Sequence, residues 1–189
     1  GVNNANRLFS INTLTGFATE IGTLNASVSA VGLAFDSNND ILYLSDTNSS
    51  LLFSVNTTTA VVSALVNLGV PVVGLAYDAN SSTLFGLSQN GELLDIDPGV
   101  NVTSIGPTGL LANNARGLAF DNNSNTLYLS DTQNSTLFTV DTATASVTSV
   151  GSTGVIFSPG LTYIPEPASA SLIVIGGLFT AARRRPMRF

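Results

Sequence analysis

The residues with the strongest potential for chemistry in this sequence are aspartates and asparagines, because most other reactive side chains are missing. The 189 residues contain no Cys, His or Trp, and all six basic residues are arginines. A thiol nucleophile, an imidazole base, a Schiff-base lysine and a Cys/His zinc site are therefore excluded. Catalysis or binding would have to use carboxylates, amides, hydroxyls or an arginine.

Two oxygen-rich segments have the spacing of calcium loops. Residues 36–40 and 121–125 carry oxygen-bearing side chains at alternate positions. Neither segment has the glycine and glutamate that stand at the sixth and twelfth positions of an EF-hand loop. Aspartate and asparagine also cap the backbone N–H groups of turns, and the equivalent residues 78–82 are poorer in ligands. We interpret all three as turns and expect no metal site and no cofactor.

These turns belong to an internal repeat. Residues 31–36 (VGLAFD), 73–78 (VGLAYD) and 116–121 (RGLAFD) are near copies, and residues 160–163 (GLTY) begin a fourth. The four glycines stand 42, 43 and 43 residues apart: Gly32, Gly74, Gly117 and Gly160. After each copy come a polar turn, an apolar run, a second turn, an alternating run and a run rich in Val, Ser and Thr.

Four short strands in a unit of roughly 40 to 45 residues are typical of a β-propeller blade. A β-sandwich also has short, evenly spaced strands, but it need not copy one four-strand unit three times. The apolar period is near two, which excludes a helical solenoid. The sequence therefore predicts an all-β propeller of four-stranded antiparallel blades over residues 1–164, with blades starting near residues 32, 74 and 117.

The two ends of this region look like parts of one further blade. Residues 1–23 match the third and fourth strands of a unit, and residues 160–164 match a closing first strand. Only the second strand has no counterpart, so we expect the chain to be truncated just before Gly1. The simplest complete molecule then has about four blades; the alternative is a larger ring.

The sequence motifs of the repeat resemble those of NHL-like bacterial extracellular propellers. These motifs are GLAFD at residues 32–36, LYLSDT at 42–47 and LFSVNTTT at 52–59. The resemblance covers nearly all of residues 1–164. It implies a fold and no particular activity.

The last 25 residues have a different composition. Pro165-Glu166-Pro167 precedes fifteen uncharged residues, 168–182, and Arg183-Arg184-Arg185 follows them. A proline suits the first turn of a helix, so we expect an apolar helix here. Positive residues beside an apolar helix stay in the cytoplasm, which would place the body of the protein outside. A permanent anchor or an amphipathic surface helix is the alternative interpretation.

This order of elements resembles the PEP-CTERM sorting domain of Gram-negative bacteria. The resemblance implies transient insertion in the inner membrane, recognition by an exosortase, cleavage near Pro165-Glu166-Pro167 and delivery to the cell surface or an extracellular polysaccharide matrix. Pro165, Glu166 and Pro167 would be the recognition element, and Arg183, Arg184 and Arg185 the cytoplasmic stop.

Charge separates the body from this tail. Residues 1–164 carry eleven carboxylates against Arg7 and Arg116, a net of −9, whereas residues 165–189 have a net of +3. An acidic body with two arginines cannot displace many phosphate counterions. We therefore expect no nucleic-acid partner.

Residues that depart from the repeat mark a candidate ligand face. Arg116 stands where the other copies have an apolar residue, and it lies on the loop side on which propellers commonly bind ligands. The full candidate set is Arg116, Asn113, Asn114, Asp46, Gln89 and Asp131. The alternative for Arg116 is a surface ion pair. No catalytic residue is assigned, because the acidic residues mostly repeat at equivalent positions, as turn residues do.

The sequence thus favours an exported, non-enzymatic propeller with a structural or interaction role at the cell surface. Its partners would be an exosortase, the membrane and extracellular polysaccharide. A carbohydrate- or metal-binding propeller module is the second hypothesis, and a propeller hydrolase is the third.

Overall fold

The computed structural model describes residues 1–110, 115–154 and 161, and these residues form fourteen β-strands and no helix. The all-β prediction is confirmed, while the expected C-terminal helix lies outside the described residues. The strands are β1 (Arg7–Ile11), β2 (Ala18–Thr23), β3 (Ala30–Asp36), β4 (Ile41–Asp46), β5 (Leu51–Val55), β6 (Val62–Asn67), β7 (Val72–Asp78), β8 (Thr83–Ser88), β9 (Glu92–Asp97), β10 (Asn101–Pro107), β11 (Ala115–Asp121), β12 (Thr126–Asp131), β13 (Thr136–Val140) and β14 (Val147–Ser152).

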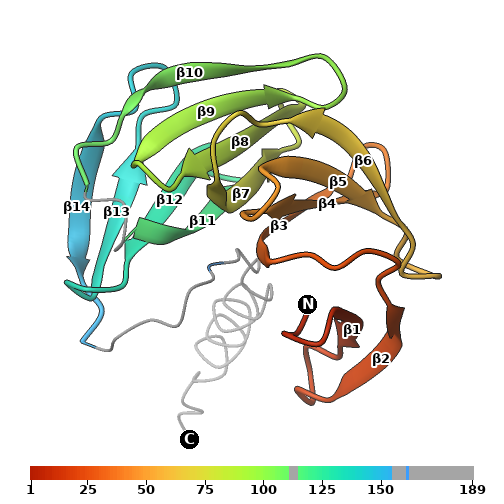
Figure 1. Ribbon diagram of the computed structural model, residues 1–189. Coiled ribbons are helices and arrows are strands. Elements are labelled where there is room, and N and C mark those ends of the chain that lie inside the picture. Colours follow the sequence, from red (N-terminus) through yellow and green to blue (C-terminus); the bar gives the residue numbers. More distant parts are fainter. Residues whose placement is uncertain (111–114, 155–160, 162–189) are drawn as a thin grey trace, which may run out of the picture.

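The strands form three four-stranded antiparallel sheets and one hairpin. We call β3–β6 blade 1, β7–β10 blade 2, β11–β14 blade 3 and β1–β2 the N-terminal hairpin. Within each blade the strands follow one another in chain order. The blades stand side by side in an arc, with β3, β7 and β11 on its inner side and β6, β10 and β14 on its outer side (Figure 1). The predicted four-stranded antiparallel blades are thus confirmed.

Both faces of blades 1 and 2 are covered by their neighbours, which accounts for the nearly continuous apolar second strands of these two blades. Successive side chains of a strand point to opposite faces. In β4, Leu44 packs with Leu8 between blade 1 and the N-terminal hairpin, while its neighbour Tyr43 packs with Leu75 between blades 1 and 2. A third apolar cluster joins blades 2 and 3. The core of the molecule therefore lies between blades.

Glycine at the start of the innermost strand permits the close approach of the next blade. A Cβ atom on Gly32 would lie 2.6 Å from Ser45 Oγ and 3.2 Å from the backbone nitrogen of Leu75. A Cβ atom on Gly117 would lie 3.0 Å from the backbone nitrogen of Leu161. Leu161 therefore stands beside blade 3 as Leu75 stands beside blade 1.

A β-bulge beside these glycines recurs in every blade. The register between the first and second strands shifts between Ala30 and Gly32, between Val72 and Gly74, and between Ala115 and Gly117. A bulge bends its strand and increases the local twist. The three copies of the repeat thus share their irregularities as well as their strands.

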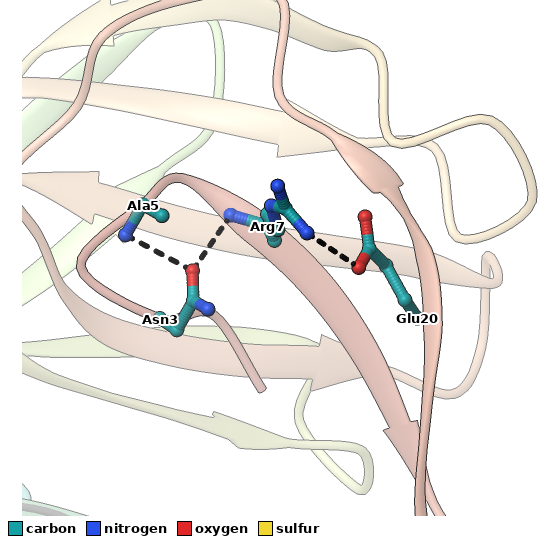
Figure 2. Close-up of polar contacts among 4 residues, drawn as sticks. All are labelled: Asn3, Ala5, Arg7 and Glu20. Atoms are coloured by element: carbon teal, nitrogen blue, oxygen red, sulfur yellow. Dashed lines mark hydrogen bonds and ion pairs between the residues drawn. The ribbon is translucent and has the colours of Figure 1, made fainter.

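The N-terminal hairpin has the contacts of a third and a fourth strand. Gly22 of β2 lies against Ala60 of blade 1, where an added Cβ would be 3.3 Å from the alanine Cβ. Gly106 of blade 2 lies against Ala145 of blade 3 in the same way. Across the hairpin, Arg7 Nη1 donates to Glu20 Oε2 at 3.0 Å (Figure 2). Because this pair is exposed, it adds little to stability.

The first two residues pair with β1. Val2 forms an antiparallel bridge with Leu8, and Gly1 and Phe9 exchange two backbone hydrogen bonds of 2.8 Å. Asn3 Oδ1 then accepts hydrogen bonds from the backbone nitrogens of two residues of the following turn, Ala5 and Arg7, each at 3.0 Å (Figure 2). Val2 thus adds a single bridge to β1, and among the described residues no strand is assigned before Arg7.

We expect Phe120→Ala to lower the free energy of unfolding by about 3 to 5 kcal/mol, because it empties a closely packed core position. Phe120 is buried between blades 2 and 3, and its ring stacks on Phe85 with centroids 6.0 Å apart. Urea-induced unfolding at neutral pH measures the change.

Phe35 is the matched control, since it holds the same repeat position but is 48% exposed. Phe35→Ala should cost roughly 1 kcal/mol or less. Equal losses for the two variants would show that the core does not lie between blades.

Candidate functional site

Three members of the predicted ligand face lie at one end of the blades: Asp46, Gln89 and Asp131. Each ends a second strand or follows one. The register pairs Ala30 with Asp46 and Ala115 with Asp131, so the second strands end beside the starts of the first strands. Gln89 follows β8 at the same end and is exposed.

The other members of the predicted face cannot be placed as side chains. Arg116 lies in the β-bulge of β11, between Ala115 and Gly117, and only its backbone is described. Asn113 and Asn114 lie outside the described residues, as do Pro165, Glu166, Pro167, Arg183, Arg184 and Arg185.

Asp46 and Asp131 are buried, and their carboxylates cap turns. Asp46 accepts hydrogen bonds from the backbone nitrogen of Ser29 at 2.8 Å and from Ser49 Oγ at 2.6 Å. Asp131 accepts them from Gln133 N at 2.8 Å and from Asn134 Nδ2 at 2.7 Å. Carboxylates that are engaged in this way have little capacity left for a ligand.

The hydrogen bonds of Asp46 also determine its acidity. Burial acts to raise the pKa of this carboxyl, but the hydrogen bonds from Ser49, Ser29 and Asn48 outweigh burial and hold the pKa below its ordinary value. The ionised form is therefore the one that stabilises the fold.

The oxygen-rich segments after the first strands are turns that also link neighbouring blades. Asn38 Nδ2 donates to the carbonyl of Ala79 at 2.9 Å, and Asn122 Oδ1 accepts from the backbone nitrogen of Ala79 at 2.7 Å. Within each turn the leading aspartate caps its own backbone, as Asp78 does for Asn80 at 2.8 Å. In the part of the chain that the structure describes, no three acidic side chains converge as a metal site would require.

An axial cavity of about 470 Å³ lies between the three inner strands. Its wall is formed by apolar side chains of β3, β7 and β11, among them Phe35, Tyr77 and Phe120, and its rim by Ser37, Asn122 and Asn123. Ser37, Asn122 and Asn123 follow the ends of the first strands, so this polar part of the lining lies at the end opposite to the predicted ligand face. Its volume suits a small molecule.

Tyr77 lines this cavity, and Asp36 is a neighbour of Tyr77. Burial raises the pKa of the Tyr77 phenol, so this hydroxyl stays neutral at physiological pH. Burial also acts to raise the pKa of Asp36, but hydrogen bonds, the first of them from Asn39, hold it below its ordinary value. The lining of the cavity therefore combines aromatic side chains with the neutral Tyr77 residue, while the Asp36 carboxylate is engaged by its own turn.

No family model matches the chain, and no curated protein matches it in sequence. Solved structures do resemble it. A chain of the nidogen/laminin complex aligns with a TM-score of 0.68 and 16% identity over 85% of this chain and 64% of that one. A Bacteroides thetaiotaomicron protein of unknown function aligns with a TM-score of 0.62 and 18% identity over 86% of this chain and 50% of that one.

Virginiamycin B lyase from Staphylococcus aureus is also similar, with a TM-score of 0.54 and 16% identity over 86% of this chain and 50% of that one. Like the structures above, it is a β-propeller, so the described part of the chain has the fold of a β-propeller module. This chain spans between half and two thirds of the length of these proteins.

The comparison corrects one expectation. The sequence favoured a non-enzymatic protein, yet lyases share this fold. Because one fold hosts many activities, the propeller fold is compatible with an enzyme. The prediction that this protein is not an enzyme is therefore corrected.

One cavity and one end of the molecule were missed by sequence reasoning. The axial cavity needs three inner strands at once, and no single repeat copy shows their approach. The signal that could have pointed to it is the aromatic position shared by Phe35, Tyr77 and Phe120.

We expect Asp46→Asn to destabilise the protein most at neutral pH. A lowered folded-state pKa contributes stability that is present above the unfolded value of about 4 and is lost as pH falls through the folded value. Asparagine also replaces one of the two accepting oxygens with an NH2 group, which cannot accept hydrogen bonds from the N–H groups of the turn. The difference in free energy of unfolding between parent and variant, measured in urea from pH 7 to pH 2, should shrink as the solution becomes acidic.

Asp40→Asn provides the control at neutral pH, because Asp40 is an exposed turn residue. This variant should unfold within about 0.5 kcal/mol of the parent. A constant difference between the parent and Asp46→Asn at every pH would show that the Asp46 charge does not stabilise the turn.

Proposed function

We propose that this chain is an exported β-propeller interaction module, delivered to the cell surface or extracellular matrix of a Gram-negative bacterium by its C-terminal segment. The observation that carries the proposal is the order of three elements in residues 165–189: Pro165-Glu166-Pro167, an uncharged stretch of fifteen residues and Arg183-Arg184-Arg185. The propeller fold of the body supports it, because such modules present loops on a rigid scaffold.

The physical properties of the tail favour transient insertion over permanent anchoring. Fifteen helical residues are roughly 22 Å long, which is short of the hydrocarbon core of about 30 Å. Flanking residues and local thinning of the bilayer would supply the rest. An exosortase would then cut near Pro165-Glu166-Pro167 and release the body outward. Among the described residues, no helix is long and apolar enough to cross a membrane.

The composition of residues 1–164 suits a hydrated extracellular matrix. Its turns are rich in Asn, Ser and Thr, and its charge is strongly acidic. Such a surface presents many hydrogen-bonding groups to neutral polysaccharide and repels anionic polymers, nucleic acid included.

A second candidate function is the binding of a small molecule in the axial cavity. The cavity of about 470 Å³ favours it, because aromatic walls with a few polar groups are typical of ligand sites.

The sorting proposal predicts different defects for two variants of the tail. Replacing Pro165-Glu166-Pro167 with alanines should leave insertion intact but stop processing, so the full-length chain accumulates at the inner membrane. Replacing Arg183, Arg184 and Arg185 with neutral residues should instead weaken the orientation of the helix, because each charge favours cytoplasmic retention.

Cell fractionation in a host with an exosortase, followed by mass measurement of the mature C-terminus, distinguishes these results. If the surface material still ends at Phe189, the chain is not processed and the tail is a plain anchor.

A further inference from the structure

A polar groove runs between blades 2 and 3, away from the axial cavity. Its volume is about 710 Å³, and it adjoins a second hollow of about 360 Å³ along β9 and β10. Three residues of blade 2 line both hollows: Thr83, Asp95 and Thr103. On the side of blade 3, the turn residues Asn125 and Thr142 form the opposite wall.

Asp95 breaks the repeat in this groove. The register places it between Phe85 of β8 and Thr103 of β10. The same position holds Ser54 in blade 1 and Thr139 in blade 3. Turn aspartates recur from blade to blade, whereas a carboxylate at this third-strand position occurs in blade 2 and in neither of the other two.

The Asp95 carboxylate has unused hydrogen-bonding capacity. It is exposed, and it accepts no hydrogen bond among residues 1–110, 115–154 and 161. Asp78, on the edge of the same groove, accepts from Asn80 N at 2.8 Å and Ser81 Oγ at 2.6 Å. An ionised carboxylate is an acceptor only, with about four lone-pair sites. Asp95 is therefore suited to a ligand that donates several hydrogen bonds.

The rest of the lining narrows the ligand class. Hydroxyls of Thr83, Thr103 and Ser104 and the amide of Asn125 both donate and accept, while Phe85 and Ile105 add apolar surface. Among the described residues that line the two hollows there is no arginine, and Asp97 stands in the second, so an anionic polymer would be repelled. A divalent cation lacks the three acidic ligands that it would need among the described residues.

We propose that this groove binds a neutral glycan chain, with Asp95 accepting hydrogen bonds from sugar hydroxyls. Sugar hydroxyls donate and accept at closely spaced positions, and the adjoining hollows provide length for more than one sugar unit. This choice of ligand rests on the proposed function, because a protein of an extracellular polysaccharide matrix would meet glycan chains. The site itself is tested on purified protein, without reference to export.

The test measures binding of neutral gluco-, manno- and galacto-oligosaccharides to the full 189-residue chain by titration calorimetry. The chain is purified from a host without an exosortase, so that it stays intact. At least one neutral series should bind, and the affinity should change little with added salt, because the ligand carries no charge.

Asp95→Asn should raise the Kd roughly ten- to hundredfold, the loss expected when charged hydrogen bonds disappear. Asp40→Asn makes the same chemical change on an exposed turn of blade 1 and should leave the Kd unchanged. Asp95→Thr installs the residue that blade 3 has at this position, so it should keep the fold, as its thermal unfolding would confirm, and still lose binding.

Three results would overturn the inference: no binding of any neutral series, an equal Kd for Asp95→Asn and its parent, or preferential binding of polygalacturonate or calcium. Binding of glycan by a chain that is not sorted would refute only the proposed delivery. Sorting of a chain that binds no neutral glycan would refute only this site.

Discussion

No blade of this molecule can bury its apolar surface alone. Each is a single sheet with apolar side chains on both faces, so stability comes from contact with the next blade. Gly32 and Gly117 allow close contacts, since a side chain would collide with Leu75 of the neighbouring inner strand at Gly32 and with Leu161 at Gly117. The close approach of inner strands is therefore the constraint on which the rest of the structure depends.

This constraint places the polar residues. Faces between blades must be apolar, so polar side chains gather in turns and along the blade rims. Most of the turn aspartates and asparagines are then needed to satisfy backbone N–H groups that no strand pairs, as Asp46 and Asp131 do. Asn38 and Asn122 go further and join the turns of adjacent blades. The polar residues of these turns therefore stabilise the fold.

The repeat made much of the fold predictable. Copies such as VGLAFD and VGLAYD marked the first strand of each blade. The prediction of a turn at residues 36–40 agrees with the hydrogen bonds of Asp36. Contacts between blades were less accessible, because they join residues about 40 positions apart with no local pattern. The axial cavity is of this kind, because its lining comes from β3, β7 and β11 together. The repeat thus predicts the strands of each unit, whereas the axial cavity depends on how three units approach one another.

The carboxylates therefore fall into two groups with different meanings. Those that repeat, such as Asp36 and Asp78, are occupied by their own turns, and their recurrence reflects folding. Asp95 does not repeat, caps no turn and lies in a groove between two blades. Because propellers include a lyase as well as a chain of the nidogen/laminin complex, the shared fold cannot decide between binding and catalysis. Chemistry in this chain must be sought where the repeat is broken and the polar group is not needed by the fold.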